Sequence, residues 1–380
     1  MRRRTGKGTG RTPYVGRAPW LAGAMLATAT GGGAQELESI SWDDERWTIE
    51  GEAHTERYLG REALVLDGRA VLDLEMVDGR IVFDVAGTSE MGFYGVGFRD
   101  VGDDNYEHFY VRPFQSGRPD ATQYSPVHNG VSAWQLYSGE AYGQAIDIPV
   151  EQWVRVEMVF RGRRLDVWVD GQHLVFPALD HAVRSGRIAL MGSGAVPGRF
   201  SDLRVEPEAR TTVPAVEGPP PAAVPDDAVR VWSVSSPFDE ALLEGVEDLE
   251  ELDRSMLSWS TLEAGPGGVM NVARLHRRTP TANTVLARVV LEADEATVVR
   301  APFGYSDRVG VFVNGERVFS GRSEWRSRDH RFLGTVGPFD EVSMRLRPGR
   351  NEVILALSET FGGWGGMMRI DAPGVRVVRP

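Results

Sequence analysis

Cysteine is absent from this chain of 380 residues. Its absence excludes a disulfide framework and any metal site built on thiolates. Histidine offers no substitute, because His108, His128 and His173 show neither the His-x-His nor the His-x-x-x-His spacing that zinc sites use. We therefore predict no zinc site.

Long hydrophobic runs are also scarce. The apolar run near the N-terminus, residues 18–29, is shorter than the ~20 residues that a transmembrane helix needs. Basic residues without any acid precede it, and small residues follow it up to Gln35. This order is typical of a secretory signal peptide over residues 1–35, although a basic tail without signal function is the alternative. We expect a secreted or periplasmic protein that does not insert into the membrane.

Positive charge is in the minority. The chain has 42 lysine and arginine residues against 54 aspartate and glutamate residues, a net charge of −12. A surface of this sign repels the phosphates of nucleic acids and the headgroups of anionic lipids. We predict neither of them as a partner.

Alternation of apolar and polar residues is, by contrast, abundant. It runs through residues 70–76, 79–85, 94–99, 153–160, 229–234 and 284–291. Such runs with a period of two are typical of half-buried antiparallel strands. Residues 165–176 predict a hairpin, because Asp170-Gly171 between two alternating runs is a turn signal. The fold class that follows is all-β.

Proline marks the expected division of the chain. Residues 208–227 are rich in proline and lack apolar periodicity, which favours an extended linker. We expect one β-sandwich over residues 36–207 and a second over residues 228–380. Residues 239–257 are the one helix candidate, because their leucine, valine and methionine residues recur at helical spacing.

Four segments of the first predicted domain carry a family resemblance when they are taken in order: residues 79–85, 151–157, 167–171 and 200–205. On these segments the domain resembles the concanavalin A-like lectin and glucanase superfamily, especially its laminin-G-like and 3-keto-disaccharide hydrolase types. The resemblance implies a jelly-roll sandwich. The Glu-x-Asp-x-x-Glu strand that carries the catalytic carboxylates of laminarinase-type enzymes in this superfamily has no counterpart here.

Two segments stand out in the second predicted domain: residues 309–319, with a tight turn at Asn314-Gly315, and residues 346–355. On these segments the domain resembles galactose-binding-like sandwiches. The resemblance implies a fold and not a ligand. In the glycine-rich stretch 360–368, Phe361 and Trp364 either form an aromatic platform or cap the core.

One stretch, residues 100–142, looks like a binding site, because hydrogen-bonding side chains and flat aromatic rings are concentrated there. Strand alternation places Tyr106, His108, Tyr110 and Arg112 on one face. Aromatic rings stack on the C–H faces of sugars, and polar side chains bind their hydroxyls. The predicted ligand surface consists of Tyr106, His108, Tyr110, Arg112, Gln123, Tyr124, Trp134 and Gln135. The alternative is a buried hydrogen-bond network that ties a long loop to the sandwich.

Three classes of function follow. The first is a carbohydrate-binding protein whose partner is an oligosaccharide or polysaccharide. The second is an enzyme acting on glycosides, in which Glu107, His108, Asp120 and His128 are candidate acid and base groups. The third is a structural or adhesive surface module.

No cofactor is predicted. The run Asp100 to Asn105 contains oxygen donors that suit Ca²⁺, but short runs of aspartate, asparagine and glycine also form plain turns. The sequence leaves these two interpretations open.

Overall fold

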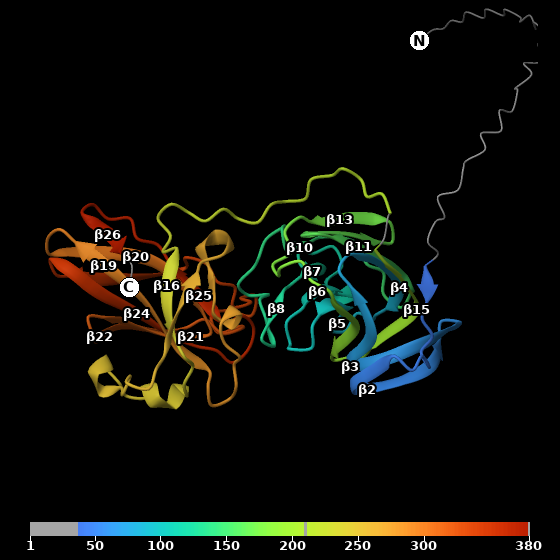
Figure 1. Cartoon of the computed structure of the whole chain (residues 1–380), viewed down its shortest axis with the longest axis horizontal. Coiled ribbons are helices and arrows are strands. Elements are labelled where there is room, and N and C mark those ends of the chain that lie inside the picture. The colour runs from blue at the N-terminus through green and yellow to red at the C-terminus, as the bar shows by residue number, and fades with distance from the viewer. Residues whose placement is uncertain (1–36, 209–210, 379–380) are drawn as a thin grey trace, which may run out of the picture. The chain divides into compact units, whose positions relative to one another are not determined.

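The computed structural model describes residues 37–208 and 211–378, and it is all-β with antiparallel sheets, as predicted (Figure 1). The segment assigned to a signal peptide lies outside the described residues. No helix in the described part of the chain is long and apolar enough to cross a membrane.

The first fifteen strands lie between Glu38 and Pro207. They are β1 (Glu38–Ser39), β2 (Trp47–Tyr58), β3 (Arg61–Met76), β4 (Gly79–Ala86), β5 (Gly92–Asp100), β6 (Glu107–Val111), β7 (Thr122–Tyr124), β8 (Val127–His128), β9 (Val131–Ser132), β10 (Gly143–Gln144), β11 (Val154–Arg161), β12 (Arg164–Val169), β13 (Gln172–Phe176), β14 (Gly186–Gly194) and β15 (Gly198–Pro207). Thirteen of them form one sheet in the order β10-β7-β6-β5-β14-β3-β15-β4-β11-β12-β13, with β1 on β15 and β2 on β3. A 3-10 turn, η1 (Pro113–Gln115), follows β6.

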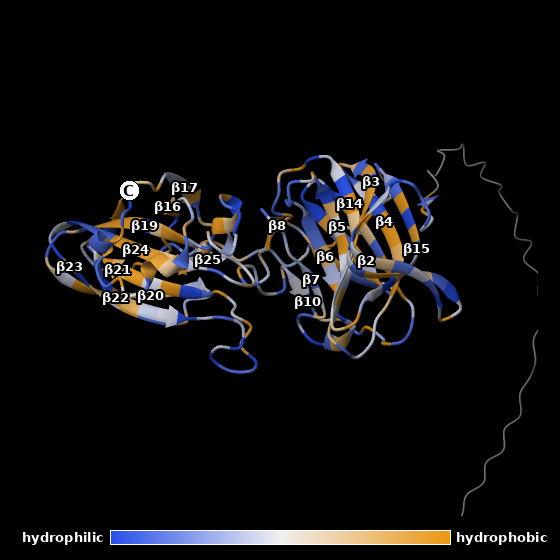
Figure 2. Ribbon diagram, turned by 90° about the horizontal axis from the view of Figure 1, so that it is seen from below, coloured by the Kyte–Doolittle hydropathy of each residue, from blue (hydrophilic) through white to orange (hydrophobic). Residues whose placement is uncertain are grey.

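This sheet folds over on itself as a sandwich. Phe109 of β6 and Phe176 of β13 lie near opposite ends of the strand order, yet their ring centroids are 5.6 Å apart. Phe98 of β5 and Phe160 of β11 meet in the same way at 4.7 Å. Hydrophobic and hydrophilic residues alternate along strands such as β15 (Figure 2). Residues 154–157 of β11 alternate between buried and more exposed positions, whereas β4 and β5 are buried along almost their whole length.

The predicted hairpin is formed by β12 and β13. Leu165 pairs with Phe176 and Val169 with Gln172. Asp170 and Gly171 between them both have positive φ, 46° and 79°, as a type I′ turn requires.

The remaining strands lie after Val231. They are β16 (Val231–Ser235), β17 (Trp259–Glu263), β18 (Met270–Asn271), β19 (Thr284–Ala293), β20 (Thr297–Ser306), β21 (Arg308–Val313), β22 (Glu316–Arg322), β23 (Asp340–Leu346), β24 (Gly349–Ser358), β25 (Gly365–Met368) and β26 (Val375–Val378). A seven-stranded sheet, β17-β16-β19-β24-β21-β22 with β26 on β19, and a four-stranded sheet, β18-β25-β20-β23, enclose a second core. Trp232 and Trp364 are fully buried in it.

The described residues between Pro207 and Val231 form neither strand nor helix. The strands of the first sandwich therefore end before the proline-rich segment, and those of the second begin after it. The division into separate domains stays a prediction.

The helix predicted over residues 239–257 is wrong. Only two 3-10 turns form there, η2 (Glu240–Leu243) and η3 (Leu249–Glu251), and both begin at capping aspartates, Asp239 and Asp248. Gly245 between them has a φ of 75°, which ends the first turn. Val246 and Leu249 pack on the sheet from this irregular segment, whereas Leu242 and Met256 are exposed. Two further turns, η4 (Pro266–Gly268) and η5 (Val272–Arg274), flank β18.

Candidate functional site

The strand face predicted from alternation is present on β6. The ring centroids of Tyr106 and His108 lie 6.2 Å apart, and those of His108 and Tyr110 lie 4.8 Å apart. Opposite them, β5 has glycine: Gly97 pairs with His108 and Gly95 with Tyr110. A Cβ atom at Gly97 would come within 3.2 Å of the Tyr106 ring, so the missing side chains let the rings lie close to the sheet.

Arginine closes both ends of this row of rings. The guanidinium of Arg69 lies 4.9 Å from the Tyr106 ring centroid, and that of Arg112 lies 5.6 Å from the Tyr110 ring centroid. Tyr110 donates its hydroxyl hydrogen to Gln123 Oε1 at 2.7 Å. We call this row the aromatic face; it consists of Arg69, Phe93, Tyr106, His108, Tyr110, Arg112 and Gln123. Four of its members, Tyr106, Tyr110, Arg112 and Gln123, are only 6–8% exposed, so most of the row is covered by other parts of the protein.

His108 at the centre of the aromatic face lacks a polar partner. Its Nε2 atom is shielded from solvent and has no hydrogen-bond partner among the described residues. Burial, and secondarily the charge of Arg69, lower the pKa of His108 to about 3. The imidazole is therefore neutral at ordinary pH and keeps an unused hydrogen-bonding nitrogen.

A cavity of about 180 Å³ adjoins the aromatic face. It is lined by Arg112, Pro119, Asp120, Gln123, Trp134, Tyr137, Ser138, Gly139, Glu140, Tyr142, Gly143, Leu333 and Thr335. We call it the aromatic cavity. Tyr137 and Tyr142 stack with a centroid distance of 5.3 Å and an interplanar angle of 21°. Because Arg112 and Gln123 belong to both, the aromatic face and the aromatic cavity are continuous.

Two of the predicted ligand residues lie elsewhere, and the first is Tyr124. Its neighbour Gln123 belongs to the aromatic face, and adjacent strand residues point to opposite sides. Tyr124 therefore faces the core, where its hydroxyl donates to Glu107 Oε2 at 2.7 Å. Glu107 also accepts the backbone N–H of His181 at 3.0 Å, and burial raises its pKa to about 7.

The second is Gln135, which is fully buried. Its amide donates to the Leu333 carbonyl at 2.7 Å, and its Oε1 accepts from Ser306 Oγ and from Gly363 N, each at 3.0 Å. Gln135 thus ties the loop after β9 to the second sandwich and has no free group for a ligand.

Replacing Gln135 by alanine is expected to destabilise the fold by about 2–4 kcal/mol, because the buried Ser306 hydroxyl and two backbone groups lose their partner. The melting temperature measures the loss. A variant that melts within a degree of the wild type would contradict this role.

The candidate acid and base groups do not form one centre. Glu107 and His108 point to opposite faces of β6, and Asp120 pairs with Arg112 at 3.2 Å. His128 bonds Asp180 at 2.7 Å and stacks on His181 with a centroid distance of 4.1 Å. His128 and Glu107 fit the alternative interpretation, a buried network that ties a loop to the sandwich.

The carboxylates of the run Asp100 to Asn105 do not converge either. Asp100 accepts from Arg69 at 2.6 Å and from the Gly102 N–H at 2.8 Å, whereas Asp104 pairs with Arg277. The run Asp100 to Asn105 is therefore a turn whose aspartates pair with Arg69 and Arg277. Among the described residues, no group of three or more His, Cys, Asp or Glu side chains lies close enough together to hold a metal ion.

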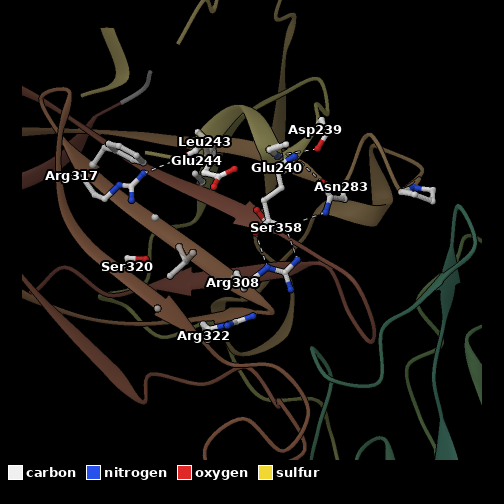
Figure 3. A pocket seen from close by; sticks show the side chains of 17 residues that line it. Asp239, Glu240, Leu243, Glu244, Asn283, Arg308, Arg317, Ser320, Arg322 and Ser358 are labelled. Carbon is white, nitrogen blue, oxygen red and sulfur yellow. Dashed lines mark hydrogen bonds and ion pairs between the residues drawn. The ribbon is translucent and has the colours of Figure 1, made fainter. Parts of the chain in front are cut away.

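The second sandwich has a larger groove, of about 580 Å³, which sequence reasoning missed (Figure 3). Its floor is formed by small residues of β21, β22 and β24, such as Gly310, Ser320 and Ala356. Arg308 lies in it and is held by both carboxylate oxygens of Glu240 at 2.7 Å. Three arginines and three acidic residues line the groove together, so its charge is balanced.

The glycine-rich stretch 360–368 does not form a platform. Trp364 is buried and donates its indole N–H to the Leu357 carbonyl at 3.1 Å, which is the core-capping role. Phe361 is 60% exposed and packs against Trp134 with a centroid distance of 6.0 Å.

Comparison with known proteins gives no family. No family model matches the chain, and no curated protein matches it. Among solved structures, the chain is similar to carbohydrate-binding module CBM66 from Bacillus subtilis, with 15% identity, 42% of this chain and 95% of the other covered, and a TM-score of 0.33.

Two further solved structures are similar to the chain. For domain 4 of an extracellular GH43 arabinanase from Geobacillus stearothermophilus, in complex with arabinotriose, the identity is 15%, the shares covered are 42% and 76%, and the TM-score is 0.29. For a β-1,3-1,4-glucanase from a mouse hindgut metagenome, the identity is 10%, the shares are 46% and 99%, and the TM-score is 0.34. At these values none of them indicates what this chain binds.

Proposed function

We propose that the protein binds an oligosaccharide or polysaccharide in the aromatic cavity. The observation that carries the proposal is the lining of the cavity. Trp134, Tyr137 and Tyr142 supply rings, while Arg112 and Asp120 supply charged hydrogen-bonding groups. Gln123 and Glu140 complete this set. Rings combined with a few polar groups are what a sugar ring requires, since it has both C–H faces and hydroxyls.

The volume of the aromatic cavity limits how many sugar units it can hold. The aromatic cavity, at about 180 Å³, is smaller than the ~300–1,000 Å³ of pockets for drug-sized ligands. It is large enough for a single monosaccharide. The predicted signal peptide is in keeping with binding outside the cytoplasm.

The direct experiment is a glycan array followed by calorimetric titration with the retained glycan. Retention of a defined oligosaccharide without product supports the proposal. If no glycan is retained, and variants in residues 106–142 only unfold, the structural or adhesive role replaces it.

His108→Phe is expected to leave glycan binding close to that of the wild type and to keep or raise the melting temperature. The substitution keeps a flat ring and removes Nε2, which is shielded from solvent and has no hydrogen-bond partner, so no intramolecular hydrogen bond is lost. Thermal melts and titration of the retained glycan check both points. A lower melting temperature would contradict the absence of a partner for Nε2.

Hydrolysis of a glycoside is a second candidate, because two carboxylates, Asp120 and Glu140, line the same cavity. Release of reducing sugar from the retained glycan would support it. The activity should then be lost in Glu140→Gln while binding persists. Binding without product leaves the carbohydrate-binding role.

A further inference from the structure

The charged side chains that line the aromatic cavity do not balance. They are Arg112, Asp120 and Glu140, and the other lining residues carry no charge. One positive and two negative charges leave an excess of one negative charge, in a chain whose net charge is −12. The sign of this excess restricts which sugars the cavity can accept, because like charges repel each other at close range.

Arg112 is already engaged within the protein. Its Nε atom donates to the Asp120 carbonyl at 2.6 Å, and one of its terminal nitrogens lies 3.2 Å from the Asp120 carboxylate. The same nitrogen donates to Gln123 Oε1 at 3.3 Å. The charge of Asp120 therefore offsets that of Arg112. An acidic group on a sugar would have to displace Asp120 in order to pair with this guanidinium.

Glu140 is the charge that remains. It is exposed, and in the part of the chain that the structure describes no hydrogen bond or ion pair holds its carboxylate. The turn that carries Glu140 is nevertheless fixed, because the N–H groups of Tyr142 and Gly143 both donate to the Gly139 carbonyl, at 3.0 and 2.9 Å. A carboxylate without a protein partner is thus held beside the cavity.

The rings of the cavity suit a cation as well as a sugar ring. Trp134 and the stacked pair of Tyr137 and Tyr142 line it. Burial, and then the negative charge of Asp180, raise the pKa values of both tyrosines, so their hydroxyls stay protonated. Neutral aromatic rings attract a cation through their quadrupole, and tryptophan does so most strongly. The rings and Glu140 therefore favour the same sign of charge on a ligand.

We infer that the sugar held in the aromatic cavity carries a protonated amine, as the units of a de-N-acetylated hexosamine glycan do. The inference rests on the proposed function and adds the chemical class of the glycan. The ammonium group would pair with Glu140, while a C–H face of the same sugar stacks on Trp134. A uronic acid would place a second carboxylate beside Glu140, and an N-acetylated unit would offer it no charge.

The test is a glycan array that presents matched oligosaccharides, followed by calorimetry. The probes are oligomers of glucosamine and galactosamine, their N-acetylated forms, oligomers of glucose and galactose, and oligomers of galacturonic acid. At about pH 6 an amine with a pKa near 8 is protonated. We expect the free-amine form to bind about fivefold more tightly than its N-acetylated form, the upper range for an ion pair in contact with solvent. About 0.5 M NaCl should remove most of this preference, because salt screens exposed charges.

Glu140→Gln keeps the shape of the side chain and removes its charge, so the two forms should then bind with about equal affinity. Glu295→Gln, which removes an exposed charge from the turn between β19 and β20, is the matched control and should keep the preference. A wild type that binds the two forms equally, or prefers N-acetylated, neutral or acidic glycans, would overturn the inference while glycan binding itself stands. A preference that persists in Glu140→Gln would overturn it as well. Retention of no glycan at all would overturn the inference together with the proposed function.

Discussion

Trp134→Ala is expected to weaken glycan binding by about 10- to 100-fold, or ~1–3 kcal/mol. Trp134 is half-buried, lines the aromatic cavity, and is held by Phe361 at a centroid distance of 6.0 Å. Its ring is therefore already in place before a ligand arrives, so stacking costs little ordering entropy. Truncation removes this surface and opens the cavity to water.

Titration of the retained glycan against wild type and variant measures the effect. Trp168→Ala is the matched control, because Trp168 of β12 is also half-buried and stacks on His173 outside the aromatic cavity. Both variants lose an aromatic contact, but only Trp134→Ala should lose affinity. Equal affinities of wild type and Trp134→Ala, with both proteins folded, would move the binding site away from the aromatic cavity.

The second large effect concerns stability against pH. Glu107 has an unfolded pKa near 4.5, and burial raises its folded pKa to about 7. Between these values the folded state holds a proton that the unfolded state releases, so stability falls as pH rises through this window. The difference of about 2.5 units corresponds to about 3 kcal/mol at full effect.

Glu107→Gln has no such proton and should gain about 3 kcal/mol relative to the wild type between pH 4.5 and pH 7.5. The comparison must be a difference between variant and wild type, because His181, with a pKa lowered to about 4 by burial, adds an opposite slope below pH 6.5. Urea unfolding at several pH values provides the data. Glu52→Gln, at an exposed position of β2, is the control. The difference between its free energy of unfolding and that of the wild type should not change with pH.

Alternation predicted much of the fold, because strands such as β23 bury every second residue, although central strands such as β5 are buried on both sides. It placed Tyr106, His108 and Tyr110 on one face because side-chain direction in a strand depends only on local geometry. The Asp170-Gly171 turn could be predicted for the same reason, because its conformation depends on the two residues that form it. The prediction of a helix over residues 239–257 was wrong because the spacing of apolar residues does not take account of the two capping aspartates or of a glycine with positive φ.

The parts of the site that sequence reasoning missed depend on contacts far along the chain. Gln135 bonds Ser306, which is 171 positions away, and no local pattern reveals that this polar residue is a buried tie. Tyr142 and Glu140 enter the cavity from a loop without regular structure. Tyr124 was misplaced for a simpler reason: it was grouped with Gln123 although neighbours on a strand face opposite sides.

The measurement that tests the central claim most directly is a crystal structure of the protein with the oligosaccharide it retains best. We predict one sugar ring in the aromatic cavity, stacked on Trp134 and hydrogen-bonded to Arg112 or Gln123. Density for the sugar in the groove around Arg308, or only on other surfaces of the protein, would contradict the account.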